Sequence, residues 1–353
     1  MNKERYANID LFRIIAMFFI LVIHCVEYGT VWCDYAGADV TDGWALANWA
    51  GMYWTMYLVS VGVNCFVMMS GFLLAEATAF RWKGAVKLWF TTLFYSFGIA
   101  LLLVACGKEP FSVLSEYAFP IYNDTYWFIT QFIALTLLSP FLARLVVALS
   151  KRDYFIMLVV LSFLNLRLFK FPYGATYGGG RTLVWFVFLF FVGAFIKRFR
   201  PFSSFKHFGK CYLIFGVLLA SAYMAMGIYL HRKNGEPLHF GNTYNNGFTF
   251  ITSLLLFLWA VNLNISGKKT ASIITRVAPF VLGVYLISEH PLLRNWLWFD
   301  TLNLQEYQNS PVLIPMQAAC CIGLFVFGIA VDYVRYRLFK ILHIDHILNK
   351  LPS

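Results

Sequence analysis

Two residues capable of acid–base or electrostatic chemistry stand inside the first apolar stretch of this sequence. Residues 9–28 read IDLFRIIAMFFILVIHCVEY, and Arg13 and His24 are eleven residues apart. An α-helix would place them about 20° apart around its axis and about 16 Å apart along it. A neutral imidazole is the usual general base at pH 7 and can also accept an acyl group. The spacing therefore predicts a cation and a catalytic imidazole on one helix face.

Two carboxylates on the same stretch could assist them. Asp10 lies one turn before Arg13 and can pair with it, and Glu27 lies three residues after His24 and can hydrogen-bond to it or to its acceptor. Simpler roles stay open: a snorkelling anchor for Arg13, an interhelical hydrogen bond for His24, and a solvated boundary carboxylate for Glu27. Because an ionisable residue is costly to place in lipid, function is the default hypothesis.

The composition indicates what kind of protein must position these residues. Of the 353 residues, 60% are hydrophobic and 13% are charged, whereas soluble domains are about a quarter charged. This excludes a soluble globular protein, a disordered tail and a secreted disulfide scaffold. The net charge of +11 is typical of cytoplasmic loops in a membrane protein, so we expect no nucleic-acid partner. No His or Cys spacing indicates a metal site.

Apolar runs long enough to cross a bilayer number about ten. They cover residues 9–28, 52–76, 85–106, 126–149, 154–171, 183–199, 211–230, 247–264, 277–293 and 312–334. We expect helices, because each backbone polar group must be satisfied within lipid. Placing both termini inside puts 20 of the 28 Lys and Arg residues in inner segments and seven in outer ones, which favours N-in/C-in. We therefore predict an all-α polytopic integral membrane protein, with one transmembrane domain over 1–353 and no appended soluble domain.

Several motifs resemble one known family. Arg13, ten intervening residues and His24 resemble the first-helix signature of the membrane acyltransferase-3 family. The segments GVNCFVMMSGFLLA, YWFITQFIALTLLSPFL, VFLFFVGAF and FVLGVYLISEHPLLRNWLW resemble its later helices through Asn64, Phe66, Ser70, Gly71, Phe72, Trp127, Phe128 and Pro140, among others. The resemblance runs essentially from end to end.

The resemblance implies a membrane-bound acyltransferase of the bacterial cytoplasmic membrane. Such proteins move an acyl group, usually acetyl from acetyl-CoA, onto hydroxyls of envelope polysaccharides or their lipid-linked precursors, without a metal. By resemblance, Arg13 would contact CoA and His24 would be the base or acyl relay. Two alternatives remain: a transporter or flippase of lipid-linked glycans, which often shows an internal repeat absent here, and a non-catalytic scaffold.

The family's Arg-x-x-Arg pattern is replaced here by basic residues of a different spacing. The segment RWKGAVKLW offers Arg81, Lys83 and Lys87. We expect Lys83 and Lys87 to neutralise CoA phosphates, although an ammonium lacks the bidentate fork of Arg. The alternative is that all three only anchor an inner loop.

The ninth span departs from the family pattern as well, because Ser288 replaces the usual His and is followed by Glu289 and His290. These two could orient an acceptor hydroxyl or steady an imidazolium, or they could cap a helix end before Pro291. Asn64 and Ser70 are candidate donors to a tetrahedral oxyanion.

The outer segment YGATYGGGR, residues 173–181, contains three successive glycines. It lacks the Lys-Ser/Thr ending of a phosphate loop. We expect the glycines to provide flexibility and Arg181 to be a candidate contact for an anionic sugar.

Overall fold

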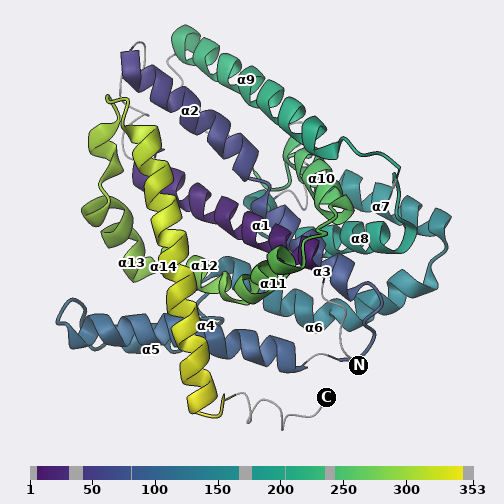
Figure 1. Cartoon of the computed structure of the whole chain (residues 1–353), viewed down its shortest axis with the longest axis horizontal. Helices are drawn as coiled ribbons and strands as arrows, with labels where there is room; N and C mark the ends of the chain where they lie inside the picture. The colour runs from purple at the N-terminus through teal and green to yellow at the C-terminus, as the bar shows by residue number, and fades with distance from the viewer. Residues whose placement is uncertain are drawn as a thin grey trace.

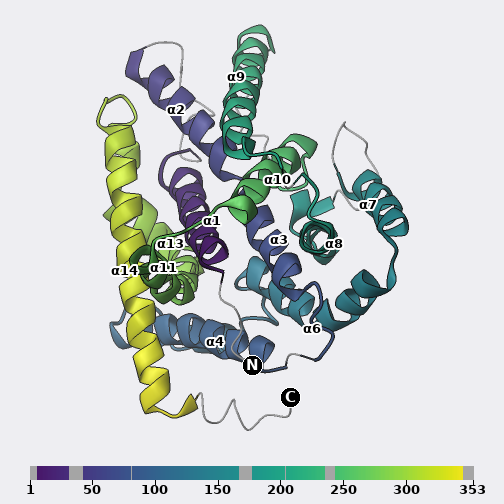
Figure 2. The same ribbon diagram turned by 45° about the vertical axis from the view of Figure 1, so that its right-hand side comes forward.

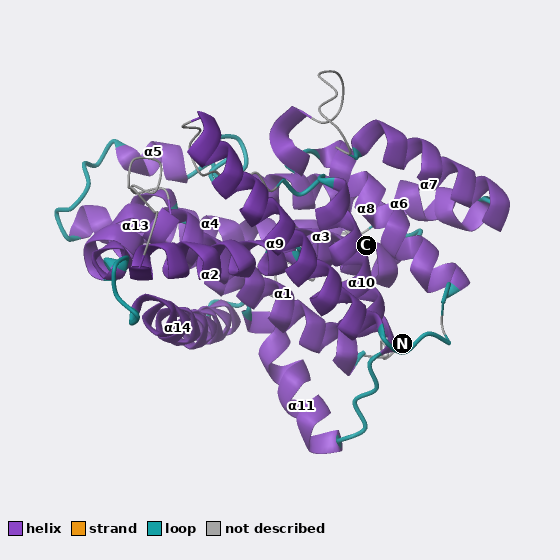
Figure 3. Ribbon diagram, turned by 90° about the horizontal axis from the view of Figure 1, so that it is seen from above, coloured by secondary structure: helices purple, strands orange, loops and turns teal. Residues whose placement is uncertain are grey.

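The computed structural model describes residues 6–31, 43–80, 82–166, 177–202, 204–234 and 243–344, and the regular secondary structure of these residues is helical (Figure 3). In chain order the elements are α1 (Ala7–Val26), π-helix η1 (Glu27–Val31), α2 (Gly43–Val59), α3 (Gly62–Leu74), α4 (Trp82–Ala105), α5 (Val113–Tyr117), α6 (Trp127–Ala148), α7 (Lys151–Asn165), 3₁₀ turn η2 (Tyr177–Gly180), α8 (Leu183–Phe199), α9 (Phe208–Asn234), α10 (Gly247–Asn262), α11 (Lys268–Val277), 3₁₀ turn η3 (Ala278–Phe280), α12 (Leu282–Ser288), α13 (Pro291–Asn295), π-helix η4 (Trp296–Thr301), 3₁₀ turn η5 (Leu304–Tyr307) and α14 (Leu313–Ile341).

Helices long and apolar enough to cross a membrane recur along the described chain. Seven segments meet this condition: Ala7–Thr30, Gly43–Leu74, Trp82–Ala105, Trp127–Ala148, Phe208–Met226, Lys268–Ser288 and Leu313–Ile341. The runs predicted at 154–171, 183–199 and 247–264 correspond to the shorter helices α7, α8 and α10, and residues 167–171 of the first run lie outside the described residues. The fold is that of a multi-pass membrane protein, as predicted; the count of ten spans and the N-in/C-in orientation stay predictions.

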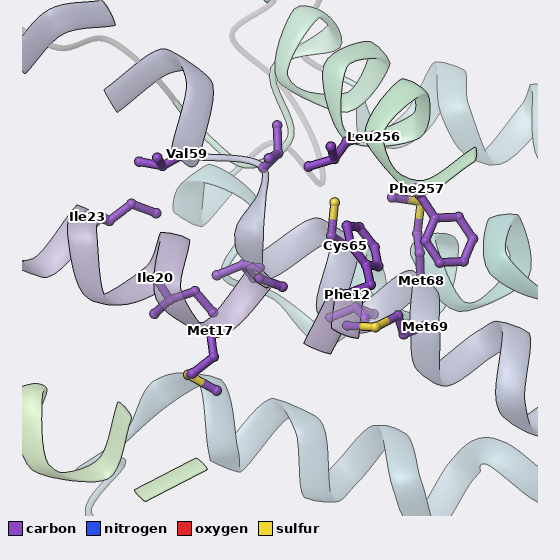
Figure 4. Close-up of a cluster of buried hydrophobic side chains, with 14 of the residues drawn as sticks. Phe12, Met17, Ile20, Ile23, Val59, Cys65, Met68, Met69, Leu256 and Phe257 are labelled. Atoms are coloured by element: carbon purple, nitrogen blue, oxygen red, sulfur yellow. The ribbon is translucent and has the colours of Figure 1, made fainter. Parts of the chain in front are cut away.

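Helix α1 lies at the centre of the bundle, surrounded by other helices (Figures 1 and 2). It packs against α2, α3, α10, α11, α12 and α14. Its buried side chains include Phe12, Met17, Ile20 and Ile23, which meet apolar residues of α3 and α10 in the core (Figure 4). A helix that is apolar on nearly all sides is suited to such enclosure. The central position surrounds the His24 side chain with protein, which leaves it 9% exposed.

Glycine allows α3 and α8 to cross at very close range. A Cβ atom on Gly71 would collide with the Phe190 carbonyl, and one on Gly193 would collide with the Met68 carbonyl. Membrane helices approach each other closely where small residues face each other. Helix packing thus explains why Gly71 and Gly193, which lie in the segments that resemble the family, are glycines.

The predicted span at 277–293 is broken into short helices. Pro279 lies in the first turn of η3, and Pro291 is the first residue of α13, a position that proline favours. Between them α12 ends at Ser288 inside the protein, where the Tyr126 hydroxyl donates to the Leu286 carbonyl (2.9 Å) and the Trp298 indole to the Ser288 carbonyl (3.2 Å). Such breaks at membrane depth require backbone that is buried in protein or lines a cavity. This break presents Ser288 and Glu289 to α1.

A buried hydrogen bond from Tyr95 joins α4 to α14 at an aspartate that also forms an ion pair within α14. Asp332 Oδ1 accepts hydrogen bonds from Tyr95 Oη (2.9 Å) and Arg335 Nε (2.6 Å), and Asp332 Oδ2 accepts from Arg335 Nη2 (3.0 Å). Gly283 of α12 leaves room for this cluster, because a Cβ there would lie 2.6 Å from the Cβ of Asp332. Asp332 was not predicted from the sequence, and its hydrogen-bond partners give it a role in helix packing.

Candidate active site

Helix α1 carries Arg13 and His24 on one unbroken helix, as the spacing predicts. Continuous α-helix from Ala7 to Val26 gives them the axial separation of about 16 Å. Arg13 Nη1 donates to Asp10 Oδ1 at 2.8 Å, so the predicted pairing one turn apart is confirmed. The His24 side chain is 9% exposed and the Arg13 side chain 27% exposed. The helix thus joins a partly open cationic end to a buried imidazole.

Both ring nitrogens of His24 contact the break after α12. His24 Nδ1 lies 3.0 Å from Ser288 Oγ, and His24 Nε2 lies 3.2 Å from Glu289 Oε2. The other carboxylate oxygen, Glu289 Oε1, accepts from the Tyr28 hydroxyl (3.2 Å) and lies 3.7 Å from Arg294 Nη1. Glu289 is therefore placed to steady an imidazolium, one of the roles expected for it.

The partners of His24 decide what the ring can do. An ionised Glu289 favours the tautomer whose proton is on Nε2, because a carboxylate only accepts. Nδ1 then carries the lone pair and can accept a proton from Ser288 Oγ. A carboxylate behind a catalytic histidine sets the tautomer and orientation of the ring and stabilises its protonated form. The arrangement is that of a general base with its orienting acid.

A buried tyrosine beside His24 has a hydroxyl without a hydrogen-bond partner among the described residues. The ring of Tyr285 lies 5.7 Å from the His24 ring between centroids, and the residue is 3% exposed. Leaving a buried polar group unpaired costs about 1–3 kcal/mol, so such a group calls for an explanation. A ligand or reacting oxygen that occupies the site transiently would provide the partner. Tyr285 was not predicted as a site residue; its position one helical turn before Ser288 was the signal that the sequence offered.

A cavity of about 200 Å³ lies on the Arg13 side of this cluster. Its lining includes Arg13, Leu88 of α4, Phe128 of α6 and Val281. The Phe128 ring in turn packs against Tyr285 with centroids 5.7 Å apart. The cavity thus extends from Arg13 to Phe128. Phe128 contacts Tyr285, which in turn packs against His24.

The predicted cofactor lysines lie at the beginning of α4. Lys83 and Lys87 are four residues apart and share one helix face, with Lys87 exposed and Lys83 half-buried. Lys87 directly precedes Leu88, which lines the Arg13-side cavity. Arg81 lies outside the described residues. The lining of that cavity includes Leu88 but neither lysine, so a role of the two lysines in cofactor binding stays a prediction.

A second cavity of about 350 Å³ lies one helical turn beyond His24 in the opposite direction. Glu27 lines it together with Arg181, Thr243 and Tyr244. Burial, and then the charge of Glu27, raises the pKa of Tyr244, so its phenol stays protonated and can donate. Thr243 Oγ1 is buried without a partner among the described residues. In the described chain it is Glu289 whose carboxylate contacts His24, while Glu27 faces the cavity.

The glycine-rich segment forms one wall of the second cavity. Gly178 and Gly179 line it with φ angles of +83° and +60°, which suit glycine because it lacks a Cβ. Arg181 lies over the Trp127 ring at 5.3 Å. The glycines thus hold a specific backbone path, beyond the flexibility expected from the sequence.

The two predicted oxyanion donors have other partners in the structure. Asn64 Nδ2 donates to the Tyr244 carbonyl (2.8 Å) and Ser253 Oγ (3.2 Å), and Asn64 Oδ1 accepts from Trp185 Nε1 (3.0 Å). The Ser70 hydroxyl donates to the Phe66 carbonyl of its own helix (3.3 Å). The Asn64 contacts join α3 to neighbouring segments, the Ser70 contact lies within α3, and the geometry does not support the oxyanion role.

His290 is a helix cap in this structure. It is fully buried, its Nδ1 accepts from the Leu292 amide (3.2 Å), and its Nε2 lies 3.2 Å from the Ser96 carbonyl. Its ring stacks on Tyr117 with centroids 5.1 Å apart. Because both nitrogens are engaged away from His24, the geometry favours the capping alternative over a catalytic role.

The comparison with protein families agrees with this geometry. The family model for acyltransferase 3, described as an acyltransferase domain, matches residues 6–335. The chain belongs to the acyltransferase-3 family. No curated protein and no solved structure shows significant similarity to it. Family membership supports a membrane acyltransferase that transfers groups other than aminoacyl groups. Among the described residues, no group of three or more His, Cys, Asp and Glu side chains could hold a metal ion.

Proposed function

We propose that this protein transfers an acetyl group from acetyl-CoA to a hydroxyl of a cell-surface polysaccharide or its lipid-linked precursor. The reaction would take place in the bacterial cytoplasmic membrane, with the acyl donor entering from the cytoplasm. The observation that carries the proposal is the position of His24, engaged by Ser288 and Glu289 between two cavities that approach it from opposite ends of α1.

The Arg13-side cavity supports a CoA donor. Acetyl-CoA carries several phosphates at one end of a long, uncharged pantetheine arm. Arg13 supplies positive charge at the end of α1 that the charge bias places in the cytoplasm, and the cavity wall beyond it is mainly apolar. Lys83 and Lys87, at the beginning of α4, would add positive charge for the phosphates. The cavity of about 200 Å³ is smaller than a typical ligand site of about 300–1,000 Å³. Binding of the arm would therefore require side chains such as Phe128 to move.

The Glu27-side cavity supports a hydroxyl-rich acceptor. Glu27 can accept hydrogen bonds from sugar hydroxyls, while Tyr244, Thr243 and Arg181 can donate to sugar oxygens. Placing such groups around a partly apolar wall is typical of small-molecule sites. The acceptor would enter from the outer side of the membrane, so the acyl group would cross most of the bilayer within the protein.

His24 is the group that links the two substrates. As a base it removes the proton of an attacking hydroxyl, and the proton then passes to the sulfur of the departing CoA. As an acyl carrier it would hold the acetyl group on a ring nitrogen before transfer. In both cases Glu289 stabilises the positive ring.

The test is the ester-linked acyl content of the host's envelope glycans. Three strains are compared: a deletion, the deletion restored with the wild-type gene, and the deletion carrying His24→Ala at matched membrane level. We expect acyl esters to disappear on deletion and to return with the wild type but not with His24→Ala.

A matched substitution controls for folding. Asn48, a buried polar residue of α2, donates to the Gln308 and Ser310 carbonyls, and Asn48→Asp at matched level reports a loss caused by instability alone. Unchanged acylation in all strains of a host that makes the acceptor would contradict the proposal. Movement of a lipid-linked glycan without acylation would instead identify a flippase.

A further inference from the structure

We propose that Ser288 is a nucleophile that carries the acyl group between acetyl-CoA and the acceptor hydroxyl. This inference rests on the proposed function, since it names the residue that forms the covalent intermediate. It is carried by the juxtaposition of a serine hydroxyl, an imidazole and a carboxylate from two segments that are 264 residues apart in sequence.

The three groups have the order of a nucleophile, a base and an orienting acid. Ser288 Oγ lies 3.0 Å from His24 Nδ1, and Glu289 Oε2 lies 3.2 Å from His24 Nε2. The first distance is within the hydrogen-bond reach expected between a nucleophile and its base, and the second is an ion-pair distance between the carboxylate and a protonated ring. Such constellations recur on unrelated folds and are recognised by geometry rather than by chain order.

The hydroxyl of Ser288 differs from other buried hydroxyls of this bundle. Ser139 and Ser253 donate to carbonyls of their own helices at 2.8 Å and 2.6 Å, which is the common way for a helical serine to satisfy its proton. Ser288 Oγ is 3.3 Å from the corresponding Tyr285 carbonyl and 3.0 Å from the imidazole. The Ser288 hydroxyl thus lies closer to the His24 imidazole than to the backbone carbonyl of Tyr285.

The surroundings of Ser288 suit an acyl ester. The residue is 2% exposed, so water has little access to hydrolyse an intermediate. Phe128 lines the Arg13-side cavity and packs against Tyr285, whose hydroxyl has no partner among the described residues. That phenol is a donor available to the oxyanion of a tetrahedral intermediate.

The chemistry balances without a further reactant. Ser288 Oγ attacks the thioester carbonyl as its proton passes to His24 Nδ1, the carbon–sulfur bond breaks, and the proton leaves with the CoA thiol. In the second half, an acceptor hydroxyl gives its proton to His24 and attacks the Ser288 ester. The serine oxygen then leaves and recovers that proton, so free serine and an acetyl ester are formed.

The experiment uses the purified full-length protein in lipid nanodiscs with radiolabelled acetyl-CoA. In the absence of acceptor we measure CoA release and protein-bound label after acid quenching, and we locate the label by peptide mass spectrometry. Envelope extract from the deletion strain is then added as acceptor. The variants are Ser288→Ala, Ser288→Cys and, as the matched control, Ser139→Ala, which removes a buried helical hydroxyl on α6.

We expect about one CoA released per protein molecule and an acetyl group on the peptide that contains Ser288. Addition of acceptor should discharge this label. Ser288→Ala should lose the label and more than about 100-fold of turnover, while Ser139→Ala keeps both. Ser288→Cys should carry an acetyl thioester that neutral hydroxylamine removes.

Three results would overturn the inference while leaving the acyltransferase function intact. These are label on His24, normal turnover in Ser288→Ala, or lost turnover in Ser288→Ala without any label in the wild type, which would make Ser288 a positioning residue. If neither the wild type nor Ser139→Ala releases CoA with acceptor present, the proposed function itself fails, and the inference with it.

Discussion

Replacing Glu289 by Gln removes one negative charge from beside His24 with little change in shape. In the wild type, Glu289 Oε2 lies 3.2 Å from His24 Nε2 in a largely buried site. Two opposite unit charges at this distance attract each other by about 5 kcal/mol at an effective dielectric constant of about 20. This attraction exists only when the ring is protonated, so it stabilises the transition state more than the resting enzyme.

The size of the expected effect follows from that difference. About 1.4 kcal/mol in activation free energy corresponds to a tenfold change in rate, so complete loss of about 5 kcal/mol would slow the reaction between 10³- and 10⁴-fold. A glutamine amide can still accept a hydrogen bond from Nε2–H. We therefore expect kcat to fall about 10³-fold, with the KM for acetyl-CoA changed by less than about threefold.

The assay is acetyl ester formation by the purified protein in nanodiscs at saturating acetyl-CoA. Glu116→Gln, which neutralises an exposed carboxylate of α5, is the matched control and should retain wild-type rates. A kcat for Glu289→Gln within about fivefold of the wild type, with equal protein in the membrane fraction, would refute the role derived for the carboxylate.

Further predictions concern the substrate cavity and the packing. Arg13→Ala should raise the KM for acetyl-CoA about tenfold or more in steady-state kinetics, because a cation beside the CoA phosphates is lost; an unchanged KM would move the CoA site elsewhere. Gly71→Ala should lower the thermal unfolding temperature measured in detergent, because the added Cβ collides with the Phe190 carbonyl; equal stability would refute the close crossing. Asp332→Asn should destabilise by about 3–5 kcal/mol, because it leaves Arg335 buried without its counter-charge, and the same unfolding measurement checks it. His290→Ala should cost about 1 kcal/mol of stability as a lost cap yet keep kcat within about threefold; a loss comparable to Glu289→Gln would restore a catalytic role.

The parts of the site that depend on local geometry could be predicted from the sequence. Arg13, His24 and Asp10 lie on one helix, and helical periodicity alone relates them. The charge-poor apolar runs likewise indicated a membrane bundle, because their length and composition require it. The enclosure of α1 by its neighbours needed the three-dimensional structure.

The parts that depend on distant segments could not be predicted in this way. Periodicity places Glu27 near His24, yet the carboxylate that contacts the ring is Glu289, from a helix break 265 residues further along the chain. Asn64 was a reasonable oxyanion donor from its polarity within a span. In the structure the Asn64 side-chain amide forms hydrogen bonds with Tyr244, Ser253 and Trp185. Polarity indicates that a residue needs a partner, and only the fold shows which partner it has.

The distinction between satisfied and unsatisfied polar atoms separates structure from chemistry in this bundle. Asp332 is as deeply buried as any residue of the site, but Tyr95 and Arg335 occupy its carboxylate, so it stabilises the packing of α14. The Tyr285 hydroxyl has no partner among the described residues, although a buried donor without one is costly. An unpaired buried donor can persist at a functional site, where a substrate atom accepts its hydrogen bond during the reaction. The unpaired phenol lies next to an imidazole that contacts both a serine and a carboxylate, and this combination supports the proposal that acyl transfer takes place near the His24 end of α1.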